Sequence, residues 1–191
     1  PGTTAVLAAI DNDQQLAVET LLACAHQSDY ETATGETNIM RAVTKERWAI
    51  LSSLVGGFES VDMELTNGDT ALLVAVRNGH SEGVQRLVRE GASVDFENRH
   101  GVTALMEAVL SEKSGMVKVV MSGGASVDRV NRHGHSAMTF ACDKGVDADV
   151  VATLLEHGAM PHIETFKGYT PLISAAKSGN SPALTALLNA G

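Results

Sequence analysis

The stretch VDFENRHGVTALMEA, residues 94–108, returns almost unchanged as VDRVNRHGHSAMTFA, residues 127–141. The two copies lie 33 positions apart. A catalytic site needs its chemistry only once, whereas a structural unit that cannot bury its apolar face alone must be repeated along the chain. The doublet therefore indicates a repeat architecture.

A glycine recurs at nearly the same interval along the whole chain. Its spacings are 33, 33, 33, 33 and 34 residues, at Gly2, Gly35, Gly68, Gly101, Gly134 and Gly168. Six copies in phase predict a single array of six stacked units, with approximate boundaries at 1–31, 32–64, 65–97, 98–130, 131–164 and 165–191. Because the chain opens on Pro1 and not on Met, we expect it to be an excerpt of a longer protein.

Each unit has the pattern of two helices. A hydroxyl residue two positions after each glycine is suited to cap the start of a helix, and an Ala-rich run follows it. After a short break, apolar residues at i, i+3 and i+4 predict the buried face of a second helix. Gly-Ala pairs at 91–92, 124–125 and 158–159 close three of the units, because glycine readily adopts the left-handed conformation that ends a helix.

These features together resemble the ankyrin repeat, most clearly in GDTALLVAVRNGHSEGVQRLVREGASVD from Gly68 to Asp95. The resemblance covers essentially the whole chain. It implies an all-α ankyrin-repeat solenoid of stacked helix-turn-helix units with extended turn fingers. Only the sixth copy keeps the proline of the family pattern, Pro171, and no copy keeps the histidine that follows it. We therefore expect the Thr-to-His hydrogen bonding of that family to be absent.

The composition excludes some classes of partner. The formal net charge of −9 argues against nucleic acid, because binding to phosphates needs clustered Lys and Arg. No apolar run approaches the ~18 residues that span a bilayer, so we expect a cytoplasmic (intracellular) protein without membrane contact. Residues 1–98 hold 6 Lys or Arg against 15 Asp or Glu, whereas residues 99–191 hold 8 of each. The first half thus carries all of the net negative charge.

Catalytic and cofactor motifs are missing from the sequence. It has no Gly-rich phosphate loop ending in Gly-Lys-Ser/Thr, no HExxH and no GxSxG, so we expect neither an enzyme nor a cofactor. An enzyme is the alternative from another functional class. It would require Asp143, His133 and His135 to surround a cavity or an ion. His100 and His133 occupy equivalent turn positions of two repeats, so we expect no metal site.

The two cysteines give no framework for a disulfide or a zinc site. Cys24 and Cys142 are far apart, and each lies in a helix-like apolar stretch. We expect both to be small core residues.

Binding in such arrays usually falls on the concave side, made by the finger tips and the first helices, because those positions do not have to pack. We expect the partner to be a protein or peptide, and a basic one, since the acidic half would attract it electrostatically. We expect the module itself to be monomeric. The predicted contact residues are Glu31, Glu64, Phe96, Glu97, Arg99, Arg132, Phe166 and Tyr169.

Two interpretations of the glutamates at the finger tips stay open. In one, Glu97 forms an exposed ion pair with Arg99 or Arg132, worth about 0–1 kcal/mol. In the other, the glutamates form a ladder of carboxylates for a basic peptide, with aromatic anchors beside it. The alternative function is that of an intramolecular docking or spacer arm in a larger multidomain protein, which predicts weak binding to free peptides.

Overall fold

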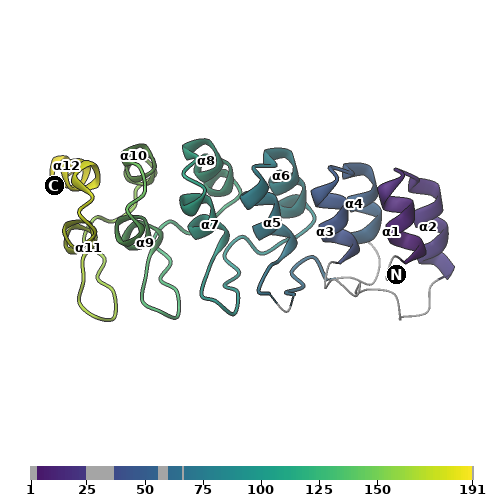
Figure 1. The fold of residues 1–191 in the computed structure, drawn as a ribbon, viewed down its shortest axis with the longest axis horizontal. Coiled ribbons are helices and arrows are strands. Elements are labelled where there is room, and N and C mark those ends of the chain that lie inside the picture. The colour runs from purple at the N-terminus through teal and green to yellow at the C-terminus, as the bar shows by residue number, and fades with distance from the viewer. Residues whose placement is uncertain (1–3, 25–36, 56–59, 66, 191) are drawn as a thin grey trace. The chain divides into compact units, whose positions relative to one another are not determined.

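The computed structural model of the chain describes residues 4–24, 37–55, 60–65 and 67–190. All twelve elements of regular structure in these ranges are α-helices, arranged in sequence as six pairs (Figure 1). The all-α ankyrin-like architecture predicted from the sequence is confirmed.

The chain divides into two compact units. Unit 1 is Pro1–Ser93 and unit 2 is Val94–Gly191. Unit 1 holds α1 (Ala5–Asp11), α2 (Gln15–Cys24), α3 (Asn38–Thr44), α4 (Trp48–Val55), α5 (Ala71–Asn78) and α6 (Ser81–Arg89). Unit 2 holds α7 (Ala104–Leu110), α8 (Ser114–Ser122), α9 (Ala137–Lys144), α10 (Ala148–Glu156), α11 (Pro171–Ser178) and α12 (Ser181–Asn189).

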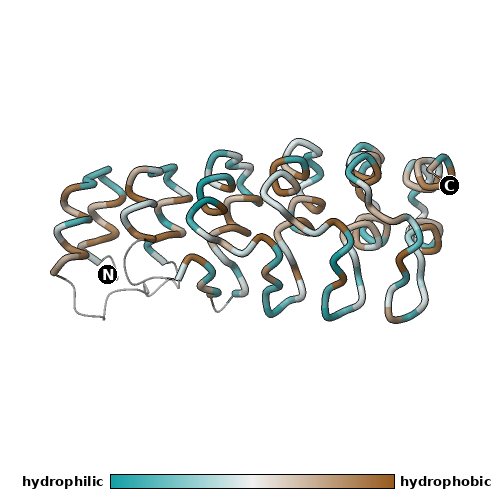
Figure 2. The backbone as a smooth tube through the Cα atoms, turned by 180° about the vertical axis from the view of Figure 1, so that it is seen from behind, coloured by the Kyte–Doolittle hydropathy of each residue, from teal (hydrophilic) through white to brown (hydrophobic). Residues whose placement is uncertain are grey.

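Within each unit, corresponding helices of successive pairs pack on one another. In unit 2, α9 lies between α7 and α11, and α10 lies between α8 and α12. The core of that unit is formed where these rows meet, with Met106, Met138 and Leu154 fully buried. Figure 2 shows that the hydrophobic segments of the chain lie largely along the helices.

The hydroxyl residues predicted to open the first helices do so in all six pairs. The side-chain oxygen of each accepts a hydrogen bond from the backbone N–H three residues later, which satisfies an amide that the helix itself leaves unpaired. These N-caps are Thr4, Thr37, Thr70, Thr103, Ser136 and Thr170.

The fifth pair has a hydroxyl side chain at the position of the missing histidine. Thr139 stands at that position, and its hydroxyl accepts a hydrogen bond from the Ser136 backbone N–H at 2.8 Å. The Ser136 hydroxyl in turn accepts from the Thr139 backbone N–H at 3.2 Å, which completes a capping box. A short hydroxyl side chain thus replaces the histidine in this repeat.

Three turns between paired helices contain an acidic residue with positive φ. Asp13, Glu46 and Glu112 have φ between 54° and 58°, where the corresponding turns of the other pairs have glycine. In unit 1 these strained acids contact the next repeat: Asp13 pairs with Arg47 at 3.5 Å and Glu46 with His80 at 3.3 Å.

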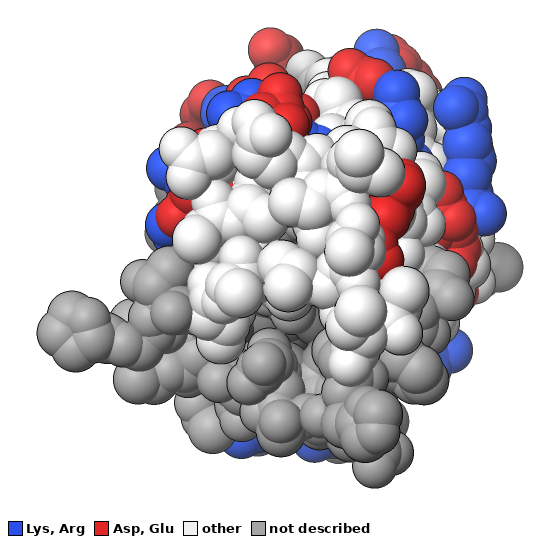
Figure 3. Space-filling view, turned by 90° about the vertical axis from the view of Figure 1, so that its right-hand side faces the viewer, with Lys and Arg blue, Asp and Glu red and all other residues white. Residues whose placement is uncertain are grey.

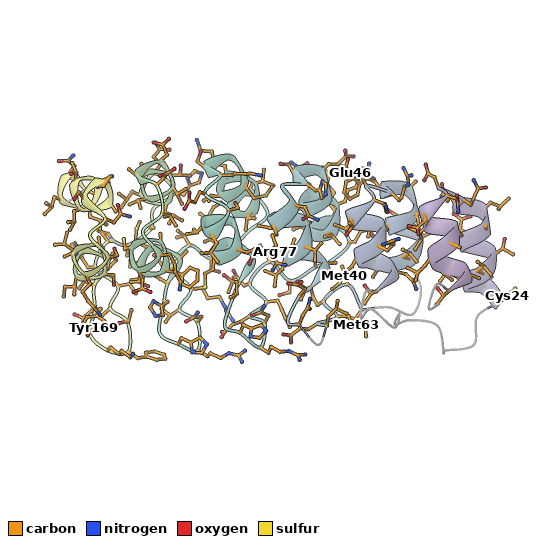
Figure 4. The ribbon with its side chains drawn as sticks, in the orientation of Figure 1. Cys24, Met40, Glu46, Met63, Arg77 and Tyr169 are labelled. Atoms are coloured by element: carbon orange, nitrogen blue, oxygen red, sulfur yellow. The ribbon has the colours of Figure 1, made fainter. Side chains whose placement is uncertain are left out.

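The two cysteines have different environments. Cys142 is fully buried, as predicted, and burial raises the pKa of its thiol to about 12. The prediction was wrong for Cys24, which is exposed. Cys24 is the last residue of α2, and its position on that helix faces outward (Figure 4). An apolar run in the sequence indicated burial there, but only part of the circumference of α2 packs.

Candidate functional site

In unit 2 three loops extend from the row formed by α7, α9 and α11, away from the row formed by α8, α10 and α12 (Figure 1). We call them the fingers of unit 2, residues 94–103, 127–136 and 160–170. Each closes through a backbone bond between residues four apart, such as the Asn131 N–H to the His135 oxygen at 2.9 Å. The fingers carry six of the eight predicted contact residues, namely Phe96, Glu97, Arg99, Arg132, Phe166 and Tyr169.

Buried asparagines shape the first two fingers. Asn131 is only 3% exposed, and its side-chain oxygen accepts from the backbone N–H groups of His133 and His135, each at 3.0 Å. Its amide nitrogen donates to the Gly101 carbonyl of the preceding finger. Asn98 bonds the backbone of its own finger in the same way. These contacts fix the shape of each finger and link one finger to the next.

Glu97 and Arg132 form an ion pair between the first and second fingers. Glu97 Oε1 accepts from the Arg132 backbone N–H at 3.0 Å and from Arg132 Nε at 2.6 Å. The guanidinium also reaches the Arg99 carbonyl at 3.4 Å. Burial pushes the pKa of Glu97 upward, but the hydrogen bonds from Arg132 outweigh it and hold that pKa below its ordinary value. At this position the ion-pair interpretation is confirmed.

Phe166 is the most exposed aromatic side chain of the described residues, at 75%. Its position is nevertheless fixed by the neighbouring finger. A Cβ atom at Gly134 would lie 2.5 Å from the Phe166 backbone nitrogen and 2.6 Å from its Cγ, so only glycine allows this approach. The Phe166 residue thus contacts Gly134 on one side and is otherwise largely exposed to solvent.

Tyr169 lies where the third finger leads into α11 (Figure 4). The Lys177 ammonium lies 4.2 Å from the centre of the Tyr169 ring, which is cation–π geometry. The ring is 36% exposed, so Tyr169 and Lys177 present an aromatic and a cationic group together.

The other four predicted contact residues differ in placement and exposure. Glu31 lies outside the described residues. Glu64 is half-buried in unit 1, on the loop before α5 that also holds Met63 (Figure 4). Phe96 is half-buried, whereas Arg99 is exposed.

A row of aspartates was missed by sequence reasoning. The carboxylate of Asp62 accepts from the Ser93 backbone N–H, that of Asp95 from the Ser126 N–H and that of Asp128 from the Met160 N–H, all at 2.9 Å. Each bond joins one repeat to the next. The Ser-Val-Asp that recurs at 60–62, 93–95 and 126–128 was a usable signal for these bonds.

The residues considered for catalysis, His133, His135 and Asp143, do not line the pocket described below for unit 2. The described residues contain no group of three or more His, Cys, Asp and Glu able to hold a metal ion. Burial lowers the pKa of His135, although the carboxylate of Asp143 works against this shift. The His133 ring packs against Gly101. A pocket of about 340 Å³ in unit 2 is lined by other residues, Pro161, His162, Thr170, Leu172, Leu187 and Leu188.

The helices described are also all too short or too polar to cross a membrane.

Comparison with known proteins agrees with this geometry. The structure of the ankyrin repeat domain of Bcl-3, described as a unique member of the IkappaB protein family, superposes with a TM-score of 0.86 over 100% of this chain and 87% of its own, at 24% identity. An ankyrin repeat domain from Acinetobacter baumannii AYE gives a TM-score of 0.78 over 97% of both chains, at 27% identity. No curated protein matches the sequence significantly.

The family assignment comes from the sequence itself. The family model described as ankyrin repeats in three copies matches residues 39–131 and 111–191. Ankyrin repeats commonly serve as protein–protein interaction modules and are generally not catalytic. The two matches together cover more than half of the chain, which therefore belongs to the ankyrin repeat family.

Proposed function

We propose that this chain is a protein-binding module that holds a segment of a partner protein on its fingers and first helices. The observation that carries the proposal is Phe166, a large aromatic side chain that is 75% exposed yet packs against Gly134. Aromatic side chains and Arg dominate the energetics of protein interfaces, and a preorganised side chain loses little entropy on binding.

The contact surface in unit 2 consists of Phe96, Arg99, Arg132, Phe166 and Tyr169. Glu97 acts in this surface by holding Arg132 in place through their 2.6 Å contact. Because the Glu97 side chain is only 15% exposed, its carboxylate is a positioning group for the arginine.

The partner segment is basic where it meets unit 1. Glu31 and Glu64 supply the carboxylates, in the half of the chain that holds 15 Asp or Glu against 6 Lys or Arg. An excess of one charge steers an oppositely charged segment toward its site and mainly raises the association rate. The attraction is screened as the salt concentration rises.

The anchoring role of Phe166 is tested by capture of partner proteins from a cell extract with wild type, Phe166→Ala and Leu16→Ala. Leu16 is a matched control, because it is 77% exposed and belongs to a second helix, α2, and not to a finger. We expect Phe166→Ala to weaken binding at least about tenfold, as loss of an interface anchor does, and Leu16→Ala to bind like wild type. Equal binding by all three proteins contradicts the proposal.

The charge of the partner is tested by the double variant Glu31→Lys with Glu64→Lys. The control is Glu112→Lys with Glu156→Lys, which changes the net charge equally at two exposed positions outside the fingers. We expect only the first variant to lose a salt-sensitive partner. If both doubles lose it to the same extent, net charge alone explains the attraction and the proposed contacts are wrong.

A further inference from the structure

The exposed charged side chains on the fingers of unit 2 are mostly cationic. Residues 94–103, 127–136 and 160–170 contain four Lys or Arg and four Asp or Glu, so their formal charges balance. Of the acidic side chains only Glu164 is exposed, whereas all four cationic ones are exposed, namely Arg99, Arg129, Arg132 and Lys167. The fingers extend downward in Figure 1, and along the lower edge of Figure 3 the charged atoms in view belong to Lys and Arg.

The other three acidic side chains are half-buried because each binds the next repeat. The carboxylates of Asp95 and Asp128 accept a backbone N–H of the following repeat, in both cases at 2.9 Å. Glu97 accepts the backbone N–H and the Nε of Arg132, and its side chain is 15% exposed against 49% for that of Arg132. Stacking thus draws the carboxylates toward the neighbouring repeat and leaves the cationic groups at the surface.

Cationic and aromatic side chains occupy equivalent positions in the three fingers. Arg99, Arg132 and Phe166 each directly follow the residue whose backbone N–H closes the finger. The next residues are His100, His133 and Lys167. In the sequence of unit 1, the corresponding positions 33–34 and 66–67 hold Ala-Thr and Thr-Asn, without charge. The cationic row is therefore a property of unit 2.

Contacts between the fingers hold this row together. The Nη1 of Arg132 lies 3.4 Å from the carbonyl oxygen of Arg99 in the preceding finger. The His133 ring and Phe166 each lie against the glycine of the preceding finger, where a Cβ atom would clash with them. A ligand on the row therefore meets side chains that are already placed, which lowers the entropy cost of binding.

We propose that the fingers of unit 2 bind an acidic segment of a partner protein. Its carboxylates contact Arg99, Arg132 and Lys167, and an apolar side chain of the segment packs on Phe166. This inference rests on the proposed function and adds the chemistry of the segment that meets unit 2. Arginine suits carboxylates because its planar guanidinium donates two parallel N–H bonds.

The spacing of the fingers sets the spacing of these carboxylates. Packed helices lie about 8–10 Å apart, so equivalent residues of successive repeats are separated by about the same distance. A polyproline II segment rises about 3.1 Å per residue, and every third residue returns to the same side. Carboxylates three residues apart therefore match successive fingers. The phosphates of a nucleic acid strand follow one another at about 3.4 Å, which is too close for one cationic group per finger.

The test measures the binding of labelled peptides by fluorescence anisotropy. The probe is a peptide of three Glu-Pro-Pro units, and the neutral control peptide has Gln in place of each Glu. The finger variant is Arg99→Gln with Lys167→Gln, which removes two cations without breaking the pair of Glu97 and Arg132. The control variant is Lys113→Gln with Lys118→Gln, which removes two exposed cations at α8, outside the fingers. Circular dichroism verifies that both variants keep their helical content.

We expect wild type and the control variant to bind the Glu peptide, more tightly at about 50 mM salt than at about 300 mM, because salt screens exposed charges. The Gln peptide should bind at least about tenfold more weakly to wild type, since it lacks all three charges. The finger variant should bind the Glu peptide at least about fivefold more weakly than the control variant, because each exposed charge contact contributes a factor of a few.

Three results would overturn the inference. The first is equal affinity of wild type for the Glu and Gln peptides, including no binding of either. The second is equal affinity of the finger and control variants for the Glu peptide. The third is tighter binding of a single-stranded oligonucleotide of the same charge, which would assign the row to nucleic acid.

Capture of the partner from a cell extract separates this inference from the proposed function. If Phe166→Ala loses the partner and the finger variant retains it, the fingers bind the partner but not through an acidic segment. The proposed function then stands and the inference fails. Loss of the partner by both variants supports both proposals, and retention by both contradicts both.

Discussion

At the scale of the single residue, Glu97 and Arg132 show how an exposed loop acquires a defined shape. The carboxylate accepts both the backbone N–H and the Nε of Arg132, so one acidic side chain fixes the main chain and the side chain of the next finger. Arg132 keeps 49% of its side chain exposed in this position. The arginine is therefore available to a partner without the entropy cost of a freely moving side chain.

We expect Glu97→Gln to lower the free energy of unfolding by about 0.5–1 kcal/mol at neutral pH. Because the pKa of Glu97 in the folded chain lies below its ordinary value of 4.5, the stabilisation is present above that value and is lost as the pH falls through the folded pKa. Urea unfolding of wild type and variant between pH 7 and pH 3 should therefore show a difference that shrinks toward acid. A difference that grows toward acid contradicts the assigned pKa direction.

Residue identity allowed part of this surface to be predicted. Stacked repeats bring together charges that lie 35 positions apart in the sequence. The ion pair between Glu97 and a neighbouring arginine could therefore be offered as one of two interpretations. Asn131 was missed, although Asn98 stands 33 positions before it. A buried amide that serves two backbone N–H groups can be recognised only when the loop geometry is known.

At the scale of the element, the turns between paired helices divide into two kinds. The turns with Gly79, Gly145 and Gly179 adopt positive φ at no steric cost. The turns with Asp13, Glu46 and Glu112 also adopt positive φ, but at a steric cost because these residues have a Cβ atom. For Asp13 and Glu46, a contact with the following repeat offsets this steric cost. The carboxylate of Glu112 makes no hydrogen bond or ion pair with the described residues, so its strain is not offset.

Glu112→Gly should raise the free energy of unfolding by about 0.5–1 kcal/mol, because relief of the left-handed strain exceeds the entropy that glycine adds to the unfolded chain. Glu46→Gly is the matched comparison, and its gain should be smaller because it also removes the 3.3 Å contact with His80. Urea denaturation of both variants measures the difference. A larger gain for Glu46→Gly would show that the His80 contact contributes nothing.

Helix starts were the most predictable elements. In a helical repeat, a Thr or Ser two residues after the repeat glycine is suited to cap the start of the first helix. All six of these residues serve as N-caps. The strained acidic turns were not predictable in the same way. Nothing in the residue type of Glu46 or Glu112 indicates positive φ, and the comparison with Gly79 in the aligned repeats was the only signal.

At the scale of the whole molecule, the repeat interval was enough to predict the fold, because six copies in phase leave stacking as the only way to bury the apolar stripes. The binding surface could be predicted only as a region. Contacts between fingers, such as that of Phe166 with Gly134, decide which exposed residues are held in place. Residue type alone does not predict these contacts.

The claim that the fingers bind the partner is tested most directly by a photo-activated crosslinking side chain placed at position 166 and, in a second protein, at position 16. Both positions are exposed to about the same extent, at 75% and 77%. We expect illumination in a cell extract to join a defined partner protein to position 166, and position 16 to give only weak and varied products. Crosslinking of the same partner with equal yield from position 16, or of none from position 166, would contradict the account.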